Sequence, residues 1–564
     1  MTELLTSAQM RAMEQAAIDS GKVTGLELME RAGQGVVDAV FAEWPGLAEG
    51  QHKALVLCGP GNNGGDGFVV ARLLAEAGWS VDVYLYGDVE KLPPDARANY
   101  ERWLETGEVT SASEVISYGI LYDMLEEGPD LFVDALFGIG LSRPLMLMAP
   151  GDPLLGEDPG EIYETPLVHW LEVPKFTDDA GEEQIRSVSI DMPSGICGDS
   201  GRMLGEGAFA VDLCVTFHGR KAGHVLAAGP RHCGKVAVVD IGLPKGYGPW
   251  LVPADVKTKL PDQRLLVEAC TSIHPVGMAM KHSGGQKYNY GHVLVLSGGV
   301  GQGGAGRMAA RGALRIGAGL VTIACPPAAL IENAAQLNAI MLKSVRDADA
   351  LVEVLEDSRI NTVCVGPGFG TGPREAAFLN AVLTRSVAPG QRSNVVIDAD
   401  ALTLLAQDED LFGALHKGCV LTPHGGEFGR LFPDIAKKLD ERPEHGPAYS
   451  KVDATCDASE RAGCTILFKG ADTVIASSEG YASINASHYD RAAPWLATAG
   501  SGDVLAGFIA GLMARGYVPG SAADAAAWAH TECALAFGPG MIAEDLPEVL
   551  PKVLADLLRS FTDA

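Results

Sequence analysis

The sequence predicts a protein of the α/β class, in which parallel sheets are flanked by helices. Short β-branched runs alternate with helical patterns along the 564 residues, and this alternation is typical of parallel strands joined by crossover helices. Hydrophobic residues make up 47% of the chain, and its 69 glycines allow many tight turns between elements. A chain of this length also predicts two or more domains.

Strand candidates recur in both halves of the chain. In the first half they cover residues 54–59, 81–86, 131–138, 187–195, 211–217 and 236–242. In the second half they cover residues 291–299, 320–326, 362–368, 394–400, 419–425 and 464–470.

The pattern breaks between the two halves, where a turn-rich segment is followed by residues without clear periodicity. We therefore predict a first domain at 1–245, a linker at 246–284 and a second domain at 285–564. Residues 147–184 are rich in Pro, Gly, Asp and Glu, which predicts an inserted surface loop between two strands.

Composition excludes several classes of function. The net charge is −29 and no long basic run occurs, so nucleic acid is not an expected partner. The sequence has neither a signal peptide nor an apolar run of about 18 residues, so we expect a cytoplasmic protein without a membrane span. The 11 cysteines occur singly, without a C-x-x-C pair, which counts against zinc and redox motifs.

A glycine-rich segment, GPGNNGGDG at 59–67, follows the first strand candidate and precedes a helical pattern. Glycines expose backbone N–H groups and asparagines offer carbonyl oxygens, a combination that suits a phosphate, a hard cation or both. The alternative is a tight turn, which needs fewer glycines. The spacing differs from the G-x-G-x-x-G fingerprint, and this weakens the case for an NAD-dependent redox enzyme.

Two further strand ends carry polar side chains: Asp134 on one, Asp191 and Ser194 on the other. Ligands of open α/β sheets bind beyond the carboxyl ends of the strands. We therefore predict that Asn63, Asp134 and Ser194 converge as oxygen donors around a monovalent cation, which leaves Asp191 as an acid or base. The alternative for each aspartate is a turn or a helix cap.

In the second half, the segment AGSGD at 499–503 runs into an apolar helix. The free N–H groups and the dipole of a helix start favour a phosphate. A carboxylate there needs a separate role, and removing a proton from a nearby hydroxyl is one that suits Asp503. The alternative is a plain helix cap.

Other strand-end loops of the second half combine glycine with a polar group. His424 and Glu427 are expected to be exposed by a Pro-Gly-Gly turn, and Lys469 stands beside a glycine. Such loops suit a phosphoryl donor, with glycines for the phosphates and lysine for their charge. The alternatives are an incidental imidazole and a solvated lysine, and no P-loop motif occurs. The remaining loops of this kind lie at 297–323, 366–370 and 398–402.

The first half resembles the NAD(P)H-hydrate epimerase domain, also called the YjeF N-terminal domain, over nearly all of residues 1–245. The resemblance is carried by MRAMEQAAIDSG, LMERAG, GPGNNGGDG, VDALFGIGLSRP, IDMPSG and HGRKAGH…GKVAVVDIGLP. It implies a Rossmann-like three-layer domain, with K⁺ at Asn63, Asp134 and Ser194. The insertion at 147–184 departs from the family pattern. The implied substrate contacts are Asn62, Asn63, Gly64, Gly65, Asp66, Gly138, Ile139, Gly140, Leu141, Ser142, Arg143, Pro144 and Asp191.

The second half resembles the ADP/ATP-dependent NAD(P)H-hydrate dehydratase family, which implies a ribokinase-like α/β domain. The match spans about residues 280–550 and includes AGSGDVLAG and the tail GMIAEDLPEVLP. It implies phosphoryl transfer to the hydroxyl of the hydrated nicotinamide, with Mg²⁺ and with ADP as our expected donor. The implied hydrate contacts are Ala305, Gly368, His424 and Asp503. The implied nucleotide contacts are Lys469, Gly470, Ala471, Asp472, Thr473 and Gly502.

Together the two resemblances imply one repair enzyme that acts on NADH and NADPH hydrates. The first half would interconvert the R and S epimers through Asp191, and the second would dehydrate the S epimer through Asp503. The chain is expected to form a homo-oligomer. The alternatives are a ribokinase-like small-molecule kinase, which would release a stable phosphorylated product, and a first half that binds without turnover.

Overall fold

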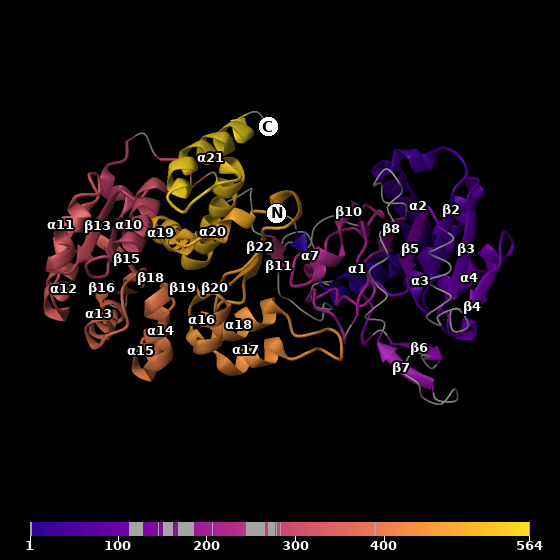
Figure 1. Ribbon diagram of the computed structural model, residues 1–564, viewed down its shortest axis with the longest axis horizontal. Coiled ribbons are helices and arrows are strands. Elements are labelled where there is room, and N and C mark those ends of the chain that lie inside the picture. Colours follow the sequence, from indigo (N-terminus) through magenta and orange to yellow (C-terminus); the bar gives the residue numbers. More distant parts are fainter. Residues whose placement is uncertain are drawn as a thin grey trace. The chain divides into compact units, whose positions relative to one another are not determined.

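The computed structural model describes residues 3–111, 128–144, 146–150, 162–166, 185–205, 207–243, 266–268, 277, 279–281, 284–388 and 391–562 (Figure 1). The chain forms two compact units. The N-terminal unit consists of Glu3–Gln263 together with Glu441–Ser450, and the C-terminal unit contains Arg264–Asp440 and Lys451–Ala564. A short segment of the predicted second domain therefore belongs to the N-terminal unit. The predicted linker falls largely outside the described residues, so its limits stay a prediction.

The N-terminal unit is built on a seven-stranded sheet in the order β4-β3-β2-β5-β8-β9-β10, with every pair parallel. In chain order of these strands this is 3-2-1-4-5-6-7, the doubly wound Rossmann arrangement, which creates a ligand crevice where the order reverses between β2 and β5. The strands are β2 (Lys53–Cys58), β3 (Ser80–Leu85), β4 (Val109–Ser111), β5 (Leu131–Ala135), β8 (Arg186–Ile190), β9 (Leu213–Phe217) and β10 (Lys235–Val239).

Helices cover one face of this sheet, where their apolar sides pack against inward-facing valines of the strands. Residues 192–205 and 207–211 contribute to the cover of the other face, with Met192, Ile196 and Phe209 buried there. Thr6 and Thr24 begin α1 and α2 with capping boxes. The remaining elements are β1 (Glu3–Leu4), α1 (Ser7–Asp19), α2 (Gly25–Glu43), η1 (Pro45–Ala48), α3 (Asn62–Glu76), η2 (Val89–Lys91), α4 (Pro94–Leu104), η4 (Ala222–His224) and α7 (Gly229–His232).

The C-terminal unit has a larger sheet in which β11-β22-β21-β20-β19-β18-β15-β12-β13-β14 are successive neighbours. Pairing is antiparallel at β20-β21 and β21-β22 and parallel in the other pairs of described strands. The strands are β11 (Leu266–Glu268), β12 (His292–Leu296), β13 (Leu320–Cys325), β14 (Met341–Ser344), β15 (Ile360–Val365), β18 (Asn394–Ile397), β19 (Cys419–Leu421), β20 (Thr465–Phe468), β21 (Asp472–Ala476) and β22 (Ala482–Ala486), with a separate hairpin of β16 (Ser386–Ala388) and β17 (Gln391–Arg392).

Helices lie on both sides of this second sheet (Figure 1). A buried cluster joins α10, α19, α20 and α21 to alternate residues of the central strands. The helices are α10 (Gly303–Arg315), α11 (Leu330–Ala334), α12 (Ala348–Leu355), α13 (Pro373–Thr384), α14 (Ala399–Gln407), α15 (Glu409–Gly413), α16 (Gly425–Leu431), α17 (Pro433–Asp440), α18 (Lys451–Ala462), α19 (Ser501–Ala514), α20 (Pro519–Phe537) and α21 (Asp545–Thr562), with short turns η5 (Lys287–Tyr290), η6 (Pro327–Ala329), η7 (Tyr489–Arg491) and η8 (Pro494–Leu496).

The predicted fold class is confirmed, and each strand candidate of the two halves coincides with a strand of the structure. The antiparallel strands β21 and β22 were missed, because the sequence analysis treated the residues after Lys469 as a loop. The predicted insertion at 147–184 contains most of an antiparallel pair, β6 (Met146–Pro150) with β7 (Ile162–Pro166); its other residues up to 184 lie outside the described ones. None of the helices in the described part of the chain has the length and apolar character that a bilayer span requires.

Candidate active sites

The glycine-rich motif of the N-terminal unit forms the first turn of α3. The helix begins at Asn62, earlier than the helical pattern from Phe68 indicates, and its cap residue Gly61 provides no side chain. Gly64 is required because a Cβ there would lie 2.0 Å from the carbonyl oxygen of Gly59. The turn therefore presents N–H groups and the side chains of Asn62, Asn63 and Asp66 beyond the end of β2.

Asp134 and Ser194 are in direct contact, as the strand-end argument predicts. The Ser194 hydroxyl donates to Asp134 Oδ1 at 2.6 Å, and the Ser194 N–H donates to Oδ2 at 2.7 Å. Ser194 Oγ also accepts from the N–H of Phe137 at 2.9 Å. Next to Phe137, a Cβ on Gly138 would lie 2.7 Å from Asn63 Oδ1 and 3.3 Å from Asp191 Cβ. The structure thus gathers these predicted residues around one loop.

This oxygen-rich group fits a hard cation. Asp134 is completely buried, and burial raises its pKa to about 7 even though Ser194 and Leu136 donate hydrogen bonds to it. Among the described residues no cationic side chain pairs with it. Within the described part of the chain, the buried Nδ2 of Asn63 has no hydrogen-bond partner, and the Oδ1 of this side chain is the atom that a cation could use. A cation near these residues would favour the ionised form of Asp134.

Asp191 is held in a left-handed backbone conformation with φ of 67°, which is unusual for a residue other than glycine. Lys221 is fully buried, and its Nζ lies 2.7 Å from Asp191 Oδ1 and 2.8 Å from Thr216 Oγ1. Thr216 donates to the same carboxylate oxygen at 2.9 Å. Burial raises the pKa of Asp191, but Lys221, His224 and Thr216 together outweigh it and lower that pKa. Asp191 is therefore an ionised carboxylate at neutral pH.

Two further carboxyl groups are affected by the charge of Asp191. Burial and the charge of Asp191 raise the pKa of Glu14, on α1, to about 7. Burial, together with Glu14 and Asp191, also raises the pKa of Asp66. Sequence reasoning missed Glu14 and Lys221, although both lie in motifs that carried the resemblance. The available signal in the sequence was a lysine close to an apolar strand, because a lysine that becomes buried there needs an acidic partner.

Cys214, His224 and Cys233 form a buried cluster beneath Asp191, with their ligand atoms within 4.8 Å of one another. His224 Nδ1 accepts from the N–H of Lys221 at 2.9 Å, and Nε2 lies 3.0 Å from the carbonyl oxygen of Asp191. Both ring nitrogens are thus engaged with backbone groups. The histidine therefore supports the backbone of Asp191.

In the C-terminal unit Asp503 lies in the first turn of α19. The cap residue is Gly500, with φ of 91° and no side-chain hydrogen bond, so Asp503 is not the helix cap that the alternative required. Burial and the neighbouring Asp398 raise the pKa of Asp503 to about 7, although Lys469 lowers it. A carboxyl group with this pKa can accept a proton near neutral pH.

Lys469 connects the other polar groups of this site. Its Nζ lies 2.8 Å from Asp398 Oδ1 and 3.8 Å from Glu427 Oε2. Asp398 stands at the cap position of α14 but makes no cap hydrogen bond, and it accepts instead from Thr422 Oγ1 at 2.8 Å. Residues 398–402 were among the predicted candidate loops, but Asp398 itself was not predicted as a site residue.

His424 is exposed as expected, but the exposure expected for Glu427 is wrong. Glu427 is 6% exposed because its carboxylate accepts from the N–H of His424 at 2.9 Å and faces Lys469. The His424 ring accepts in turn from the N–H of Glu427 at 3.4 Å, which completes a capping box at the start of α16, and it also accepts from the N–H of Gly426 at 3.0 Å.

Of the predicted nucleotide residues, Lys469 to Ala471 form the turn between β20 and β21, and Asp472 and Thr473 begin β21. Thr473 Oγ1 donates to the carbonyl oxygen of Gly470 at 2.7 Å, and Lys451 Nζ lies 2.7 Å from Asp472 Oδ1. A Cβ on Gly502 would lie 3.4 Å from Lys469 Nζ, so this turn meets the start of α19.

Ala305 and Gly368 are also neighbours: a Cβ on Gly368 would lie 3.3 Å from that of Ala305. Gly368 has φ of 60°, a conformation that favours glycine. Gly370, in the same loop, donates its N–H to Asp400 Oδ2 at 2.8 Å, and Asp400 contributes to the raised pKa of Asp503. The loop that carries Gly368 is thus linked to Asp503 through Asp400, and the contacts of Ala305, Gly368 and His424 with a hydrate stay a prediction.

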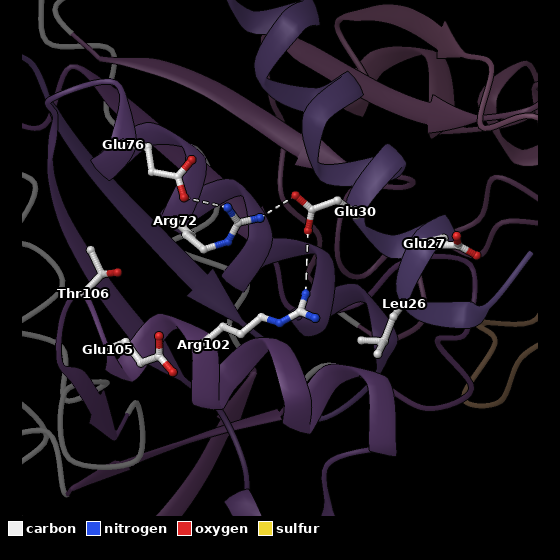
Figure 2. Close-up of a pocket in the computed structure, with 8 residues that line it drawn as sticks. All are labelled: Leu26, Glu27, Glu30, Arg72, Glu76, Arg102, Glu105 and Thr106. Carbon is white, nitrogen blue, oxygen red and sulfur yellow. Dashed lines mark hydrogen bonds and ion pairs between the residues drawn. The ribbon is translucent and has the colours of Figure 1, made fainter.

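A surface hollow of about 560 Å³ lies elsewhere in the N-terminal unit, among α2, α3 and α4 (Figure 2). It is lined mainly by charged residues, and Arg72 is paired with Glu30 and Glu76. None of the predicted site residues lines this hollow. We therefore assign it no part in the chemistry.

Comparison with known proteins gives matches for both units. A family profile described as YjeF-related protein N-terminus matches residues 25–223, and one described as NAD(P)H-hydrate dehydratase matches residues 293–554. A bifunctional NAD(P)H-hydrate repair enzyme from Moorella thermoacetica is 34% identical over 98% of this chain and 97% of its own length. The chain belongs to the bifunctional NAD(P)H-hydrate repair enzyme family.

Members and relatives of this family match either the whole chain or one half of it. The NAD(P)H-hydrate epimerase of Roseobacter litoralis is 44% identical over 43% of this chain and 100% of its own length. A solved ADP/ATP-dependent NAD(P)H-hydrate dehydratase from Bacillus subtilis, co-crystallised with ATP and Mg²⁺, covers 52% of this chain and 98% of its own. Its sequence identity is 22% and its TM-score is 0.41.

Proposed function

We propose that this chain repairs hydrated nicotinamide nucleotides through two activities. The N-terminal unit interconverts the R and S hydrates of NADH and NADPH, and the C-terminal unit dehydrates the S hydrate with ADP as phosphoryl donor. The observation that carries the proposal is the match to a bifunctional repair enzyme over 98% of the chain. The gathering of the predicted residues within each unit supports it.

For the dehydration, Asp503 accepts the proton of the ring hydroxyl while that oxygen attacks the terminal phosphorus of ADP. The new O–P bond forms as the bond to the AMP oxygen breaks, and AMP is released. The ring C–O bond of the phosphate ester then breaks, so that inorganic phosphate leaves, and loss of a proton from the adjacent ring carbon restores the double bond of the reduced nicotinamide. Lys469 and the N–H groups at the start of α19 stabilise the phosphate charge. Mg²⁺, when bound, neutralises charge on the phosphates.

Lys469 to Thr473 and Gly502 hold the nucleotide, since their turn meets the start of α19. Ala305, Gly368 and His424 hold the hydrate beside Asp503. In this arrangement the glycines permit close approach of the ligand to the backbone.

For the epimerisation, Asp191 accepts a proton and Glu14 donates one. Lys221 keeps Asp191 ionised, so Asp191 serves as the base. Glu14, with a pKa of about 7, holds a proton that it can donate at neutral pH. Residues 62–66 and 138–144 bind the nucleotide. K⁺ is held by Asn63, Asp134 and Ser194, where its charge keeps the ends of these loops together.

The test uses a mixture of both NADH-hydrate epimers with the full chain, ADP and Mg²⁺, and follows the return of dihydronicotinamide absorbance. Recovery of both epimers is expected. Recovery that stops at one epimer would remove the role of the N-terminal unit, and a lasting phosphorylated product would favour the kinase alternative.

A further inference from the structure

The segment Glu441–Ser450 lies between α17 and α18 in the sequence but is part of the N-terminal compact unit. Its backbone bonds there at two points. The N–H of Gly446 donates to the carbonyl oxygen of Ser142 at 3.0 Å, and the carbonyl oxygen of Pro443 accepts from the N–H of Gly205 at 3.0 Å. The segment is therefore bonded to the loop Gly138–Pro144 through Ser142 and to the neighbouring chain through Gly205.

Side chains of the N-terminal unit reinforce this attachment. Arg202 donates to the carbonyl oxygen of Tyr449 at 2.9 Å and also to that of Glu441, so it binds both ends of the segment. Ala448 is buried in an apolar cluster with Leu141, Cys197 and Leu204. Charged donors and apolar burial thus act together, and both are lost if the segment moves away.

These contacts hold the second half of the loop. Its first half is held elsewhere: the N–H groups of Phe137, just before the loop, and of Ile139 donate to Ser194 Oγ and Asp191 Oδ2. Leu141 and Ser142, further along, contact Gly446 and Ala448. The packing is close, because a Cβ on Gly446 would lie 2.7 Å from the carbonyl oxygen of Leu141.

We propose that Glu441–Ser450 positions the loop Gly138–Pro144, so that the C-terminal half of the sequence completes the epimerase site of the N-terminal unit. This inference rests on the proposed function, because it takes that loop to bind the hydrated nucleotide. A loop ordered before the substrate arrives loses less conformational entropy on binding. The segment therefore acts mainly on substrate affinity, and its residues do not touch the reacting atoms.

The experiment compares Gly446→Ala with Gly413→Ala in the full chain. A Cβ on Gly446 meets the loop, whereas one on Gly413, at the end of α15, has no atom within 4 Å. Epimer interconversion is followed by chromatography without ADP, so that dehydration is silent. For Gly446→Ala we expect the KM of epimerisation to rise about tenfold with kcat changed less than about twofold. Dehydration of the S hydrate with ADP, and both activities of Gly413→Ala, should not change.

Amide hydrogen exchange of residues 138–144, measured without substrate, gives a second result that does not depend on activity. Faster exchange in Gly446→Ala than in Gly413→Ala is expected. Arg202→Ala removes donors without adding volume and should have the same effects, with the exposed Arg231→Ala as its control. Unchanged KM and unchanged exchange in both test variants would overturn the inference. An inactive wild-type chain with these exchange changes would instead overturn the proposed epimerase function.

Discussion

Asp503 is a carboxyl group in the first turn of a helix, where the dipole favours ionisation, and yet its pKa is raised to about 7. Burial is the largest cause, and the neighbouring Asp398 and Asp400 add to it. Lys469, whose ammonium group lies 2.8 Å from Asp398, lowers this pKa but does not outweigh them. Asp503 is therefore partly protonated near neutral pH, and its ionised form can accept a proton from the hydroxyl group of a ligand.

Replacement of this carboxylate by an amide removes the base without changing its volume. Asp503→Asn should lower kcat of dehydration by about 10²- to 10⁴-fold, the range of general-base catalysis. In the wild type kcat/KM should rise with pH through about 7, because only the ionised form of Asp503 accepts a proton. Steady-state kinetics from pH 6 to pH 8 measures both. The control is Asp349→Asn, which changes an exposed aspartate in the first turn of α12. If Asp503→Asn dehydrated the hydrate as fast as the wild type, the role assigned to Asp503 would be wrong.

Glu14 offers a similar test in the N-terminal unit. Glu14→Gln removes the group that donates a proton near neutral pH, so epimer interconversion should slow by about 10²-fold or more. Dehydration of the S hydrate should be unaffected. Chromatographic assay of the two epimers distinguishes these outcomes, with the exposed Glu49→Gln as a control. Equal interconversion by both variants would exclude Glu14 from the proton transfers.

At the scale of elements, α10 and α19 approach closely because glycines line their contact. A Cβ on Gly507 would lie 2.1 Å from the carbonyl oxygen of Ala309, and one on Gly312 would lie 3.0 Å from that of Val504. The first turns of these two helices carry Ala305 and Asp503. Helix packing therefore sets the spacing of two residues that are proposed to hold the same substrate.

Gly507→Ala should force the helices apart and destabilise the C-terminal unit by about 2 kcal/mol, a usual cost of overpacking. Dehydration should fall with it, while epimerisation is retained. Urea unfolding followed by circular dichroism, together with the two assays, checks this. The control is Gly520→Ala near the start of α20, where the nearest atom to a new Cβ is 3.9 Å away. Unchanged stability would mean that the helices separate at little cost.

At the scale of the whole molecule, three carboxyl groups share a pKa of about 7: Asp134, which is fully buried, and Glu14 and Asp503, which are partly buried. Their ordinary values are near 4, so the folded state retains protons that the unfolded state has lost. Their contribution to stability is present at low pH and disappears as pH rises through about 7. His416 and His530, whose pKa values are lowered to about 4 by burial, act in the opposite sense, but only below their ordinary value of 6.5.

The unliganded protein should therefore lose stability between about pH 6.5 and about pH 8. Thermal unfolding at fixed ionic strength measures the trend. Asp503→Asn, which cannot ionise, should reduce the pH dependence of the C-terminal unit. A midpoint that rises across this window would show that the carboxyl groups are ionised in the folded protein.

Much of both candidate sites followed from local pattern. Alternation of apolar and polar residues marks a strand, and glycine beside a polar residue marks its end, so Asn63, Asp134, Asp191 and Asp503 could be predicted as site residues from the sequence. These signals are contained in a few consecutive residues. Where the pattern was less complete, as after Lys469, the strand β21 was read as a loop.

Other features depend on contacts between residues far apart in the chain. The charge of Asp191 acts on Glu14 because α1 packs against the sheet. Lys221 lowers the pKa of Asp191 because its buried ammonium group donates to that carboxylate. The segment Glu441–Ser450 joins the N-terminal unit through backbone hydrogen bonds, which any sequence with suitable backbone could make. Burial and charge pairing arise only when the chain is folded, and so the pKa values and partners of these groups were set by long-range packing.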